Sequence, residues 1–164
     1  MIALLENIRS MHNVGSVFRT CDGVGVKKVY LCGYTPAPVH EILGHKRPQI
    51  EKVALGSTDT VAWEKVSVAW RLVERLKKEK YTIMALEQSS AAVSLDTVSL
   101  SKGEWDTTVL VVGNEIEGVS KPVLKRADTI VDIPMLGAKR SLNVSVAFGV
   151  AVYTLLFSIK REEG

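Results

Sequence analysis

Five polar side chains stand beside glycine loops or at the start of apolar helical runs, where they could contact a ligand: Asn13, Arg19, Glu115, Ser141 and Asn143. A guanidinium binds phosphate through paired hydrogen bonds, and amides, hydroxyls and a carboxylate orient polar groups. Polar groups at the start of a buried helix need partners, either structural ones or a ligand. If the first helix approaches the loops at the strand ends, Arg19 could hold a phosphate in this way.

Two of these residues lie on the helix predicted for residues 13–24, and both also have a structural interpretation. Asn13 could be the N-cap of that helix. Arg19 could pair with a neighbouring carboxylate, such as Asp22 or Glu6. The sequence leaves these alternatives open beside the ligand-binding ones.

The remaining residues lie in a loop and before a long apolar stretch. Glu115 could be a solvated loop residue, or it could bind an asparagine or arginine of the first helix. Ser141 occupies the expected N-cap of the last helix, so self-capping alone could satisfy its first turn. Since the stretch up to Phe157 is apolar on nearly all sides, we expect a helix buried in the core.

Common nucleotide, metal and hydrolase motifs are missing. Gly23 and Gly25 follow a helix instead of opening one after a strand, and the loop 113–118 lacks the Lys-Ser/Thr pair of a phosphate loop. No Gly-x-Ser-x-Gly elbow occurs. The three histidines have no ligand spacing with carboxylates or thiols, so we expect no metal: His12, His40 and His45.

Bulk properties predict one domain, residues 1–164, in the cytoplasm. The net charge of +3 permits a polyanionic partner without demanding one. Cys21 and Cys32 lie in apolar surroundings without C-x-x-C spacing, which indicates reduced structural thiols. Glu6 interrupts the first apolar run, so no signal peptide is expected. The uncharged stretch 141–158 contains polar residues and is better explained as a buried helix than as a membrane span.

Strands and helices alternate along the chain. Short β-branched or apolar runs predict five strands: 1–5, 28–32, 81–86, 107–112 and 129–133. Helical spacing predicts helices at 13–24 and at about 63–80, a short one after Ser120, and the last helix. We expect segment 33–56 to be loop-rich and segment 88–106 to be irregular.

This alternation predicts an α/β fold with a mostly parallel sheet flanked by helices. Ligands of such sheets bind beyond the carboxyl ends of the strands. The loops 87–91, 113–118 and 134–140 follow strands and are the candidate binding loops.

Three segments in order resemble the motifs of the SpoU/TrmH branch of the SPOUT RNA methyltransferases. They are Asn7 to Thr20, with Asn-x-Gly and a later arginine; Leu110 to Glu115; and Ile133 to Met135 together with Ser141 to Ala147. The resemblance covers about residues 2–158, and three separated motifs are far more specific than one.

The resemblance implies a ribose 2'-O-methyltransferase that uses S-adenosylmethionine on tRNA or rRNA. It also implies a deep trefoil knot in the C-terminal part of the sheet, against the general rarity of knots. Members of this family are typically homodimers with active sites near the subunit interface.

Site residues follow from the matching motif positions. The resemblance implies that five residues hold the cofactor, largely through backbone groups and apolar side chains: Leu86, Gly113, Ile133, Met135 and Leu142. It implies polar active-site roles for the five residues introduced above. We expect Arg19 to stabilise phosphate and a developing alkoxide instead of acting as the base, because a guanidinium stays protonated.

Two departures from the family pattern stand out. Relatives usually have glycine after the second-motif glutamate, where this chain has Ile116, so the loop could run differently. We also expect no separate RNA-binding extension of the kind found in many relatives, so RNA contacts would come from core residues such as Arg9, His45, Lys46, Arg47, Lys139 and Arg140.

Two other functions stay open on the sequence. One is a catalytically silent RNA-binding module with the same fold, which would not bind S-adenosylmethionine. The other is a methyltransferase of the same superfamily that acts on a base nitrogen, which nucleoside analysis of the product would distinguish.

Overall fold

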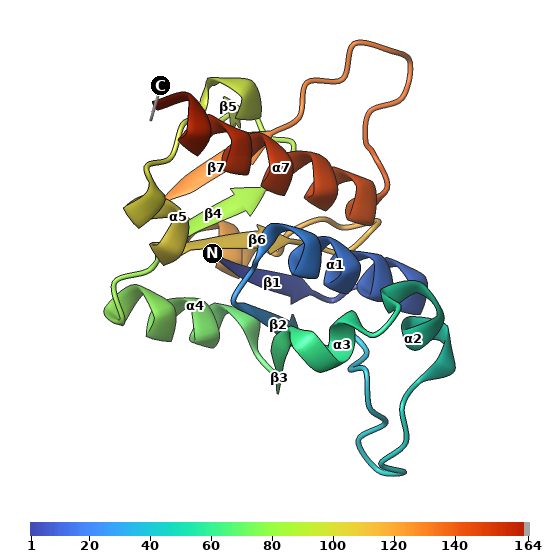
Figure 1. Ribbon diagram of the computed structural model, residues 1–164. Helices are drawn as coiled ribbons and strands as arrows, with labels where there is room; N and C mark the ends of the chain where they lie inside the picture. Colours follow the sequence, from blue (N-terminus) through green and yellow to red (C-terminus); the bar gives the residue numbers. More distant parts are fainter. Residues whose placement is uncertain (163–164) are drawn as a thin grey trace.

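Seven strands form one sheet in the computed structural model, which describes residues 1–162 (Figure 1). The strands are β1 (Ile2–Glu6), β2 (Lys28–Cys32), β3 (Ala62–Val66), β4 (Thr82–Leu86), β5 (Val93–Ser94), β6 (Thr108–Val112) and β7 (Thr129–Asp132). Their order across the sheet is β3-β2-β1-β6-β4-β7-β5, and every described pair is parallel. The predicted α/β class with a parallel sheet is confirmed.

The chain order reverses at the centre of this sheet. From β1 the sheet continues through β2 to β3 on one side, and through β6 to β4 and β7 on the other. Strands β1 and β6 are fully buried, as their continuous apolar sequences require. Such a reversal leaves a crevice beyond the carboxyl ends of the strands, where parallel sheets bind ligands.

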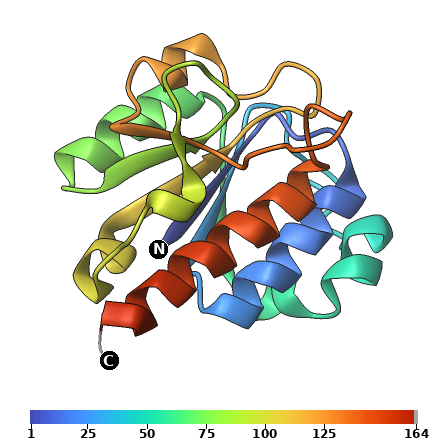
Figure 2. The same ribbon diagram turned by 90° about the horizontal axis from the view of Figure 1, so that it is seen from above.

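Helices cover both faces of the sheet. The α-helices are α1 (Met11–Val24), α2 (Pro48–Ala54), α3 (Ser57–Thr60), α4 (Ala69–Lys78), α5 (Lys102–Thr107), α6 (Lys121–Leu124) and α7 (Val144–Glu162), with a 3-10 turn at Leu95–Thr97. Helices α1, α2 and α7 pack in one apolar cluster, whereas α4 and α6 belong to a second cluster on the other face. Helices α1 and α7 lie side by side (Figures 1 and 2).

The first helix begins earlier than the sequence predicted. Ser10 is its N-cap, and the Ser10 hydroxyl accepts a hydrogen bond from the backbone N–H of Asn13. The prediction of Asn13 as the cap was therefore wrong, and its side chain is available for other contacts. The helix ends at Gly25, whose left-handed backbone (φ 71°) suits glycine.

The region predicted as one helix, residues 63–80, contains a strand and a shorter helix. Trp63 to Val66 belong to the edge strand β3, which pairs with β2, and the helix begins only at Ala69. The strand carries charged residues, so its sequence has no apolar run. The loop-rich segment 33–56 includes α2, and segment 88–106 contains β5 and the start of α5.

The last helix differs from its prediction in two ways. It begins at Val144, after Asn143, whose side-chain oxygen accepts from the backbone N–H of Ser145 at 2.9 Å, so Ser141 is not the cap. It is also not buried all round. One side faces the core, but Val146, Val150, Tyr153 and Phe157 on another side are 39–51% exposed.

Within the described residues, no helix combines the length and the apolar character that crossing a membrane needs. The trefoil knot stays a prediction. The predicted domain extends to Gly164, and its last two residues lie outside the described residues.

Candidate active site

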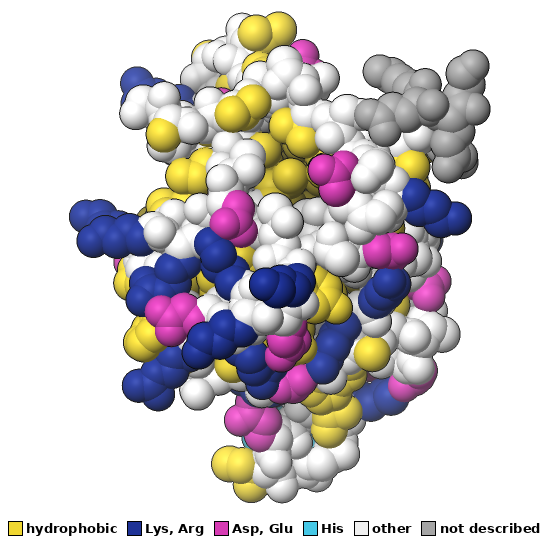
Figure 3. Space-filling view, turned by 90° about the vertical axis from the view of Figure 1, so that its left-hand side faces the viewer, with side chains coloured by type: hydrophobic (Ala, Val, Ile, Leu, Met, Phe, Trp, Pro, Cys, Tyr) yellow, Lys and Arg dark blue, Asp and Glu magenta, His cyan; other side chains and the backbone are white. Residues whose placement is uncertain are grey.

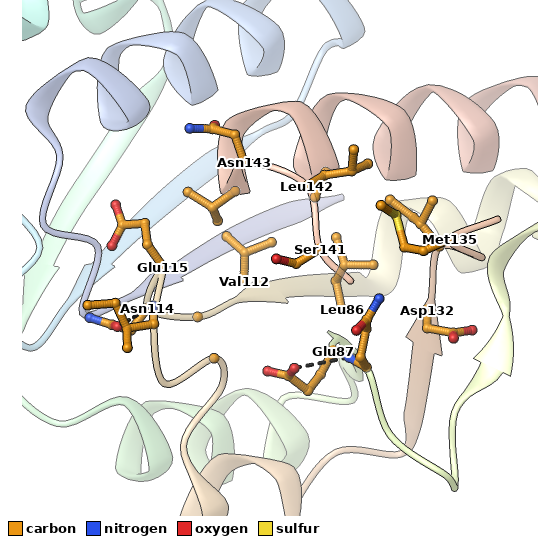
Figure 4. Close-up of a pocket in the computed structure, with 17 residues that line it drawn as sticks. Leu86, Glu87, Val112, Asn114, Glu115, Asp132, Met135, Ser141, Leu142 and Asn143 are labelled. Carbon is orange, nitrogen blue, oxygen red and sulfur yellow. Dashed lines mark hydrogen bonds between the residues drawn. The ribbon is translucent and has the colours of Figure 1, made fainter. Parts of the chain in front are cut away.

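A cavity of about 250 Å³ lies at the carboxyl ends of β4, β6 and β7 (Figure 4). Its walls come from four segments: residues 86–88, residues 112–118, residues 132–135 and the segment that leads into α7 at residues 141–147. The predicted bends at Gly113, Ile133 and Leu142 all reach this cavity, although they are far apart in sequence. Of the ten predicted site residues, all except Asn13 and Arg19 line it.

Apolar side chains form one part of the wall. In Figure 4 the side chains of Leu86, Val112, Met135 and Leu142 gather from the four segments around the same space. Ile133 also lines the cavity, at the point where the chain leaves β7. An apolar cleft with nearby backbone polar groups suits a flat heterocycle whose edges are hydrogen-bonded by the main chain.

The loop after β6 folds tightly on itself. The backbone N–H of Asn114 donates to the carbonyl of Gly118 at 3.0 Å, and the reverse bond is 2.9 Å. A Cβ at Gly113 would lie 2.1 Å from the Gly118 carbonyl carbon, so no larger residue fits there without moving the backbone. Gly113 therefore lets two stretches of main chain meet at the cavity wall.

Two carboxylates that were not predicted as site residues bind the chain directly after this loop. Glu87, directly after β4, accepts from the backbone N–H of Val119 at 2.7 Å. Glu6, at the end of β1 and only 5% exposed, accepts from the backbone N–H and the hydroxyl of Ser120 at 2.9 and 2.7 Å. The sequence feature that could have indicated this role is a glutamate at the end of a buried strand or directly after it.

Glu115 binds the start of α1. Its carboxylate accepts from the backbone N–H groups of Arg9 and Ser10, both at 3.2 Å, and from the Asn13 side-chain amide at 3.0 Å. Partial burial alone would raise the pKa of Glu115, but these hydrogen bonds outweigh it and the pKa lies below its usual value. Of the two sequence alternatives, Glu115 thus binds the first helix.

Asn13 connects this carboxylate to the last helix. Its side-chain oxygen accepts from the amide nitrogen of Asn143 at 3.2 Å, while its own amide nitrogen donates to Glu115. Asn13 is buried and lies behind the cavity wall, in contact with two residues that line it. The network Glu115–Asn13–Asn143 therefore unites the three sequence motifs at one edge of the cavity.

Arg19 does not reach the cavity in this chain. It is exposed and lies six residues, about 9 Å along the helix axis, after Asn13. Within the described part of the chain it forms neither of the considered ion pairs. Asp22 accepts from the hydroxyl of Thr60, and Glu6 accepts from Ser120.

Ile116 fits the loop without strain. The side-chain oxygen of Asn114 accepts from the backbone N–H groups of Ile116 and Glu117 at 2.8 and 3.0 Å, which shapes the turn. In this loop the left-handed backbone occurs at Gly118 (φ 71°), and Ile116 does not have a positive φ. Ile116 therefore needs no backbone conformation that favours glycine. Asn114, which the sequence analysis did not single out, organises the turn.

Comparison with known proteins shows which family this chain resembles. The model of the SpoU rRNA Methylase family matches residues 1–153. A tRNA (guanosine(18)-2'-O)-methyltransferase of Aquifex aeolicus is 35% identical over 153 residues, which are 93% of this chain and 67% of that protein. A 23S rRNA (guanosine-2'-O-)-methyltransferase RlmB of Bordetella pertussis is 30% identical over the whole chain and is matched over 61% of its own length. The chain thus spans about 61 to 67% of these two relatives.

Solved structures share the fold. The A. aeolicus TrmH/SpoU tRNA modifying enzyme has a TM-score of 0.82 at 32% identity, covering 99% of this chain and 76% of that one. The SpoU methyltransferase AviRb from Streptomyces viridochromogenes, in complex with AdoMet, has the same TM-score at 19% identity. The match covers 100% of this chain and 61% of AviRb. At 19% identity the second likeness concerns the fold alone.

Proposed function

The chain belongs to the SpoU rRNA methylase family, and on this premise we propose that it transfers a methyl group from S-adenosylmethionine to a ribose 2'-hydroxyl of tRNA or rRNA. The observation that carries the proposal is the convergence of Gly113, Ile133 and Leu142 on one cavity beside the Glu115–Asn13–Asn143 network. Two relatives named as guanosine 2'-O-methyltransferases support the reaction, and membership of the SpoU family, whose motifs imply S-adenosylmethionine, supports the cofactor.

The cavity wall fits the cofactor. Gly113 and Gly118 line the cavity without side chains, so main-chain N–H and C=O groups of this loop that are not bonded to each other could bind an adenine edge. Leu86, Met135 and Leu142 provide apolar contacts for the two faces of the ring. When bound, S-adenosylmethionine supplies an electrophilic methyl group.

The polar edge would orient the ribose. Asn143 and Ser141 line the cavity, and Asn143 is fixed through Asn13, so an incoming hydroxyl would meet groups held in one geometry. Holding the reacting oxygen in line with the methyl group can supply much of the rate. Glu115 acts as a positioning residue in this proposal, because its carboxylate is occupied by three donors.

The family's homodimer would use the exposed apolar side of α7. Val146, Val150, Tyr153 and Phe157 recur at helical spacing and form one stripe, here called the α7 face. Contiguous apolar side chains of this kind mark protein–protein contacts more often than solvent-facing surface. We therefore assign the α7 face to contact with a second copy of the chain, in the cytoplasm where the RNA substrates are found.

In such a dimer, Arg19 of one chain would lie close to the second chain. A Cβ at Gly23 would lie 3.3 Å from the hydroxyl of Tyr153, so this side of α1 borders the α7 face. Arg19 precedes Gly23 by one helical turn and shares that side. A partner bound to the α7 face would thus meet Arg19, whose guanidinium could bind phosphate in the partner's site.

Product analysis tests the proposed reaction. The protein would be incubated with methyl-labelled S-adenosylmethionine and RNA from cells that lack the gene, and the RNA then digested to nucleosides. The expected label is in a 2'-O-methylnucleoside. Label in a methylated base would identify base-nitrogen chemistry, and calorimetry without cofactor binding would identify a silent RNA-binding module.

A further inference from the structure

A second cavity, of about 550 Å³, lies between the start of α1 and the segment that follows β2. We refer to it as the basic cavity, and the residues used below are Arg9, Tyr34, His40, Glu41, Arg47 and Lys65. It does not contain any of the ten predicted site residues.

Positive charge dominates the basic cavity. Three cations, Arg9, Arg47 and Lys65, and one carboxylate, Glu41, line it. Within the part of the chain that the structure describes, none of these three cations forms an ion pair. At the amino ends of the strands, by contrast, basic and acidic side chains are mixed (Figure 3), and Lys27 and Lys28 pair with Asp106 and Glu64.

Arg47 has an unsatisfied donor. Among the described residues, its Nε is the buried side-chain nitrogen or oxygen that lacks a hydrogen-bond partner. A buried donor that stays unpaired is unfavourable. Because this guanidinium also has no carboxylate partner in the described part of the chain and lines the cavity, it would attract an anion that enters it.

Lys65 is fixed at the base of the cavity. Its ammonium donates to the carbonyls of Gly33 and Thr35 at 2.5 and 2.6 Å. Burial, with Arg47 as a further like charge, lowers the pKa of Lys65 below its usual value, while Glu41 opposes this shift. An anion in the cavity would relieve the repulsion between the two cations.

The basic cavity shares a wall with the candidate active site. The backbone N–H of Arg9 donates to Glu115, and the hydroxyl of Tyr34 accepts from the side chain of Asn114. Both Asn114 and Glu115 line the first cavity. The guanidinium of Arg9 lies 5.9 Å from the centre of the half-exposed Tyr34 ring, so a cation and an aromatic ring lie together in this wall.

We propose that the basic cavity binds the nucleotide next to the methylated one, with its backbone phosphate on Arg47 and Arg9. A single RNA strand that places a ribose at the first cavity continues through its phosphates into the neighbouring space. Unstacked bases can also stack on an arginine or tyrosine plane, as the Arg9–Tyr34 pair provides. This inference rests on the proposed RNA substrate.

Salt-dependent binding tests the proposal. The probe is a fluorescently labelled uridine oligomer of about 12 nucleotides, followed by anisotropy over about 50 to 200 mM salt. Arg47→Gln removes one phosphate contact, so the slope of log affinity against log salt should flatten by about 0.7. Affinity at low salt should fall about tenfold. Arg47→Lys keeps the charge and should keep most of the slope.

Arg71→Gln is the matched control, because Arg71 is an exposed arginine on α4, on the other face of the sheet. It should change neither slope nor affinity. Equal slopes for Arg47→Gln and the wild type, or no oligomer binding by the wild type, would overturn the proposal. The affinity for S-adenosylmethionine should be the same in all variants.

The same variants separate this proposal from the proposed reaction. If the wild type methylates a ribose and Arg47→Gln raises KM for RNA about tenfold at unchanged kcat, both stand. A normal KM with methylation intact would remove the basic cavity alone. If the wild type methylates nothing, but Arg47→Gln still flattens the slope of log affinity against log salt, the nucleotide site stands and the proposed reaction is rejected.

Discussion

The amide nitrogen of Asn143 donates to the side-chain oxygen of Asn13 at 3.2 Å, across 130 residues of sequence. This bond joins the first turn of α1 to the residue before α7, and the two helices pack side by side. The same Asn143 side chain caps α7 through its oxygen, which accepts from the backbone N–H and the hydroxyl of Ser145. One residue therefore starts a helix and fixes the edge of the cavity.

Variants of Asn143 should separate these two roles. Asn143→Ser keeps an oxygen that can cap the helix but removes the donor to Asn13. We expect its single-turnover methylation rate to fall about 10- to 100-fold, because small misplacements of reacting groups are costly. Asn143→Ala loses the cap as well and should be less stable by about 1 kcal/mol in thermal unfolding. A wild-type rate for Asn143→Ser would show that the bond to Asn13 has no role in catalysis.

Gly113→Ala should damage the cofactor pocket. The new Cβ would lie 2.1–2.2 Å from backbone atoms of Gly118 and Val119, so the loop must open. We expect at least a tenfold loss of S-adenosylmethionine affinity by calorimetry, and about 1–3 kcal/mol lower stability. Gly137→Ala is the control, since a Cβ added at Gly137 would meet nothing within 4 Å, and it should behave like the wild type. Equal affinities in both variants would contradict the assignment of Gly113.

Much of the fold followed from the sequence because buried parallel strands have continuous apolar runs. β1, β2, β4, β6 and β7 were predicted within one or two residues of their observed bounds. The edge strand β3 was missed because it pairs only with β2 and is stabilised by charged contacts such as Lys28–Glu64. Those contacts depend on residues 36 positions apart, which local periodicity does not register.

The sequence predicted the residues that line the cavity better than it predicted the hydrogen bonds between site residues. The family motifs implied which residues hold the cofactor, and the sequence left open whether Glu115 binds the first helix, but no pattern indicates that Asn13 binds Asn143. The exposed side of α7 was also missed, because an apolar helix sequence does not tell which of its sides the same chain covers. Both features depend on tertiary packing.

Both cysteines should be unreactive in the folded protein. They are free and buried, and burial raises the pKa of Cys32 to about 12 and raises that of Cys21 further. Near pH 8 the thiolate fraction should be about a thousandfold below that of an exposed cysteine. A colorimetric disulfide reagent should therefore label them only after unfolding in guanidinium. Labelling of the native protein within seconds would mean that these helices and strands open readily.

Charge on the α7 face should disrupt the proposed dimer. Phe157, 51% exposed, is expected to be covered by the second copy, so Phe157→Glu would bury an unpaired carboxylate there. Light scattering should change from the mass of two chains to that of one. Leu55→Glu changes a similarly exposed apolar residue at the end of α2 and should leave the mass unchanged. A dimeric Phe157→Glu protein would place the interface elsewhere.

Subunit mixing should reveal whether Arg19 serves its own cavity or that of the partner. Arg19→Ala keeps the cofactor cavity, whereas Leu142→Asp places a charge in the cavity wall and keeps Arg19. Each variant alone should be nearly inactive. Random mixing makes about half of the dimers mixed, and in each of these one intact cavity would meet the partner's arginine, so about a quarter of wild-type activity should return.

This recovery depends on the exposed position of Arg19, which lies away from the cavity of its own chain. If Arg19 acted within its own chain, no mixed dimer would contain a complete site and the mixture would stay inactive. The control repeats the mixing with Phe157→Glu added to both variants, because that change should prevent the two chains from forming mixed dimers. If the mixture regains activity even with Phe157→Glu present, Arg19 does not depend on a dimer formed through the α7 face.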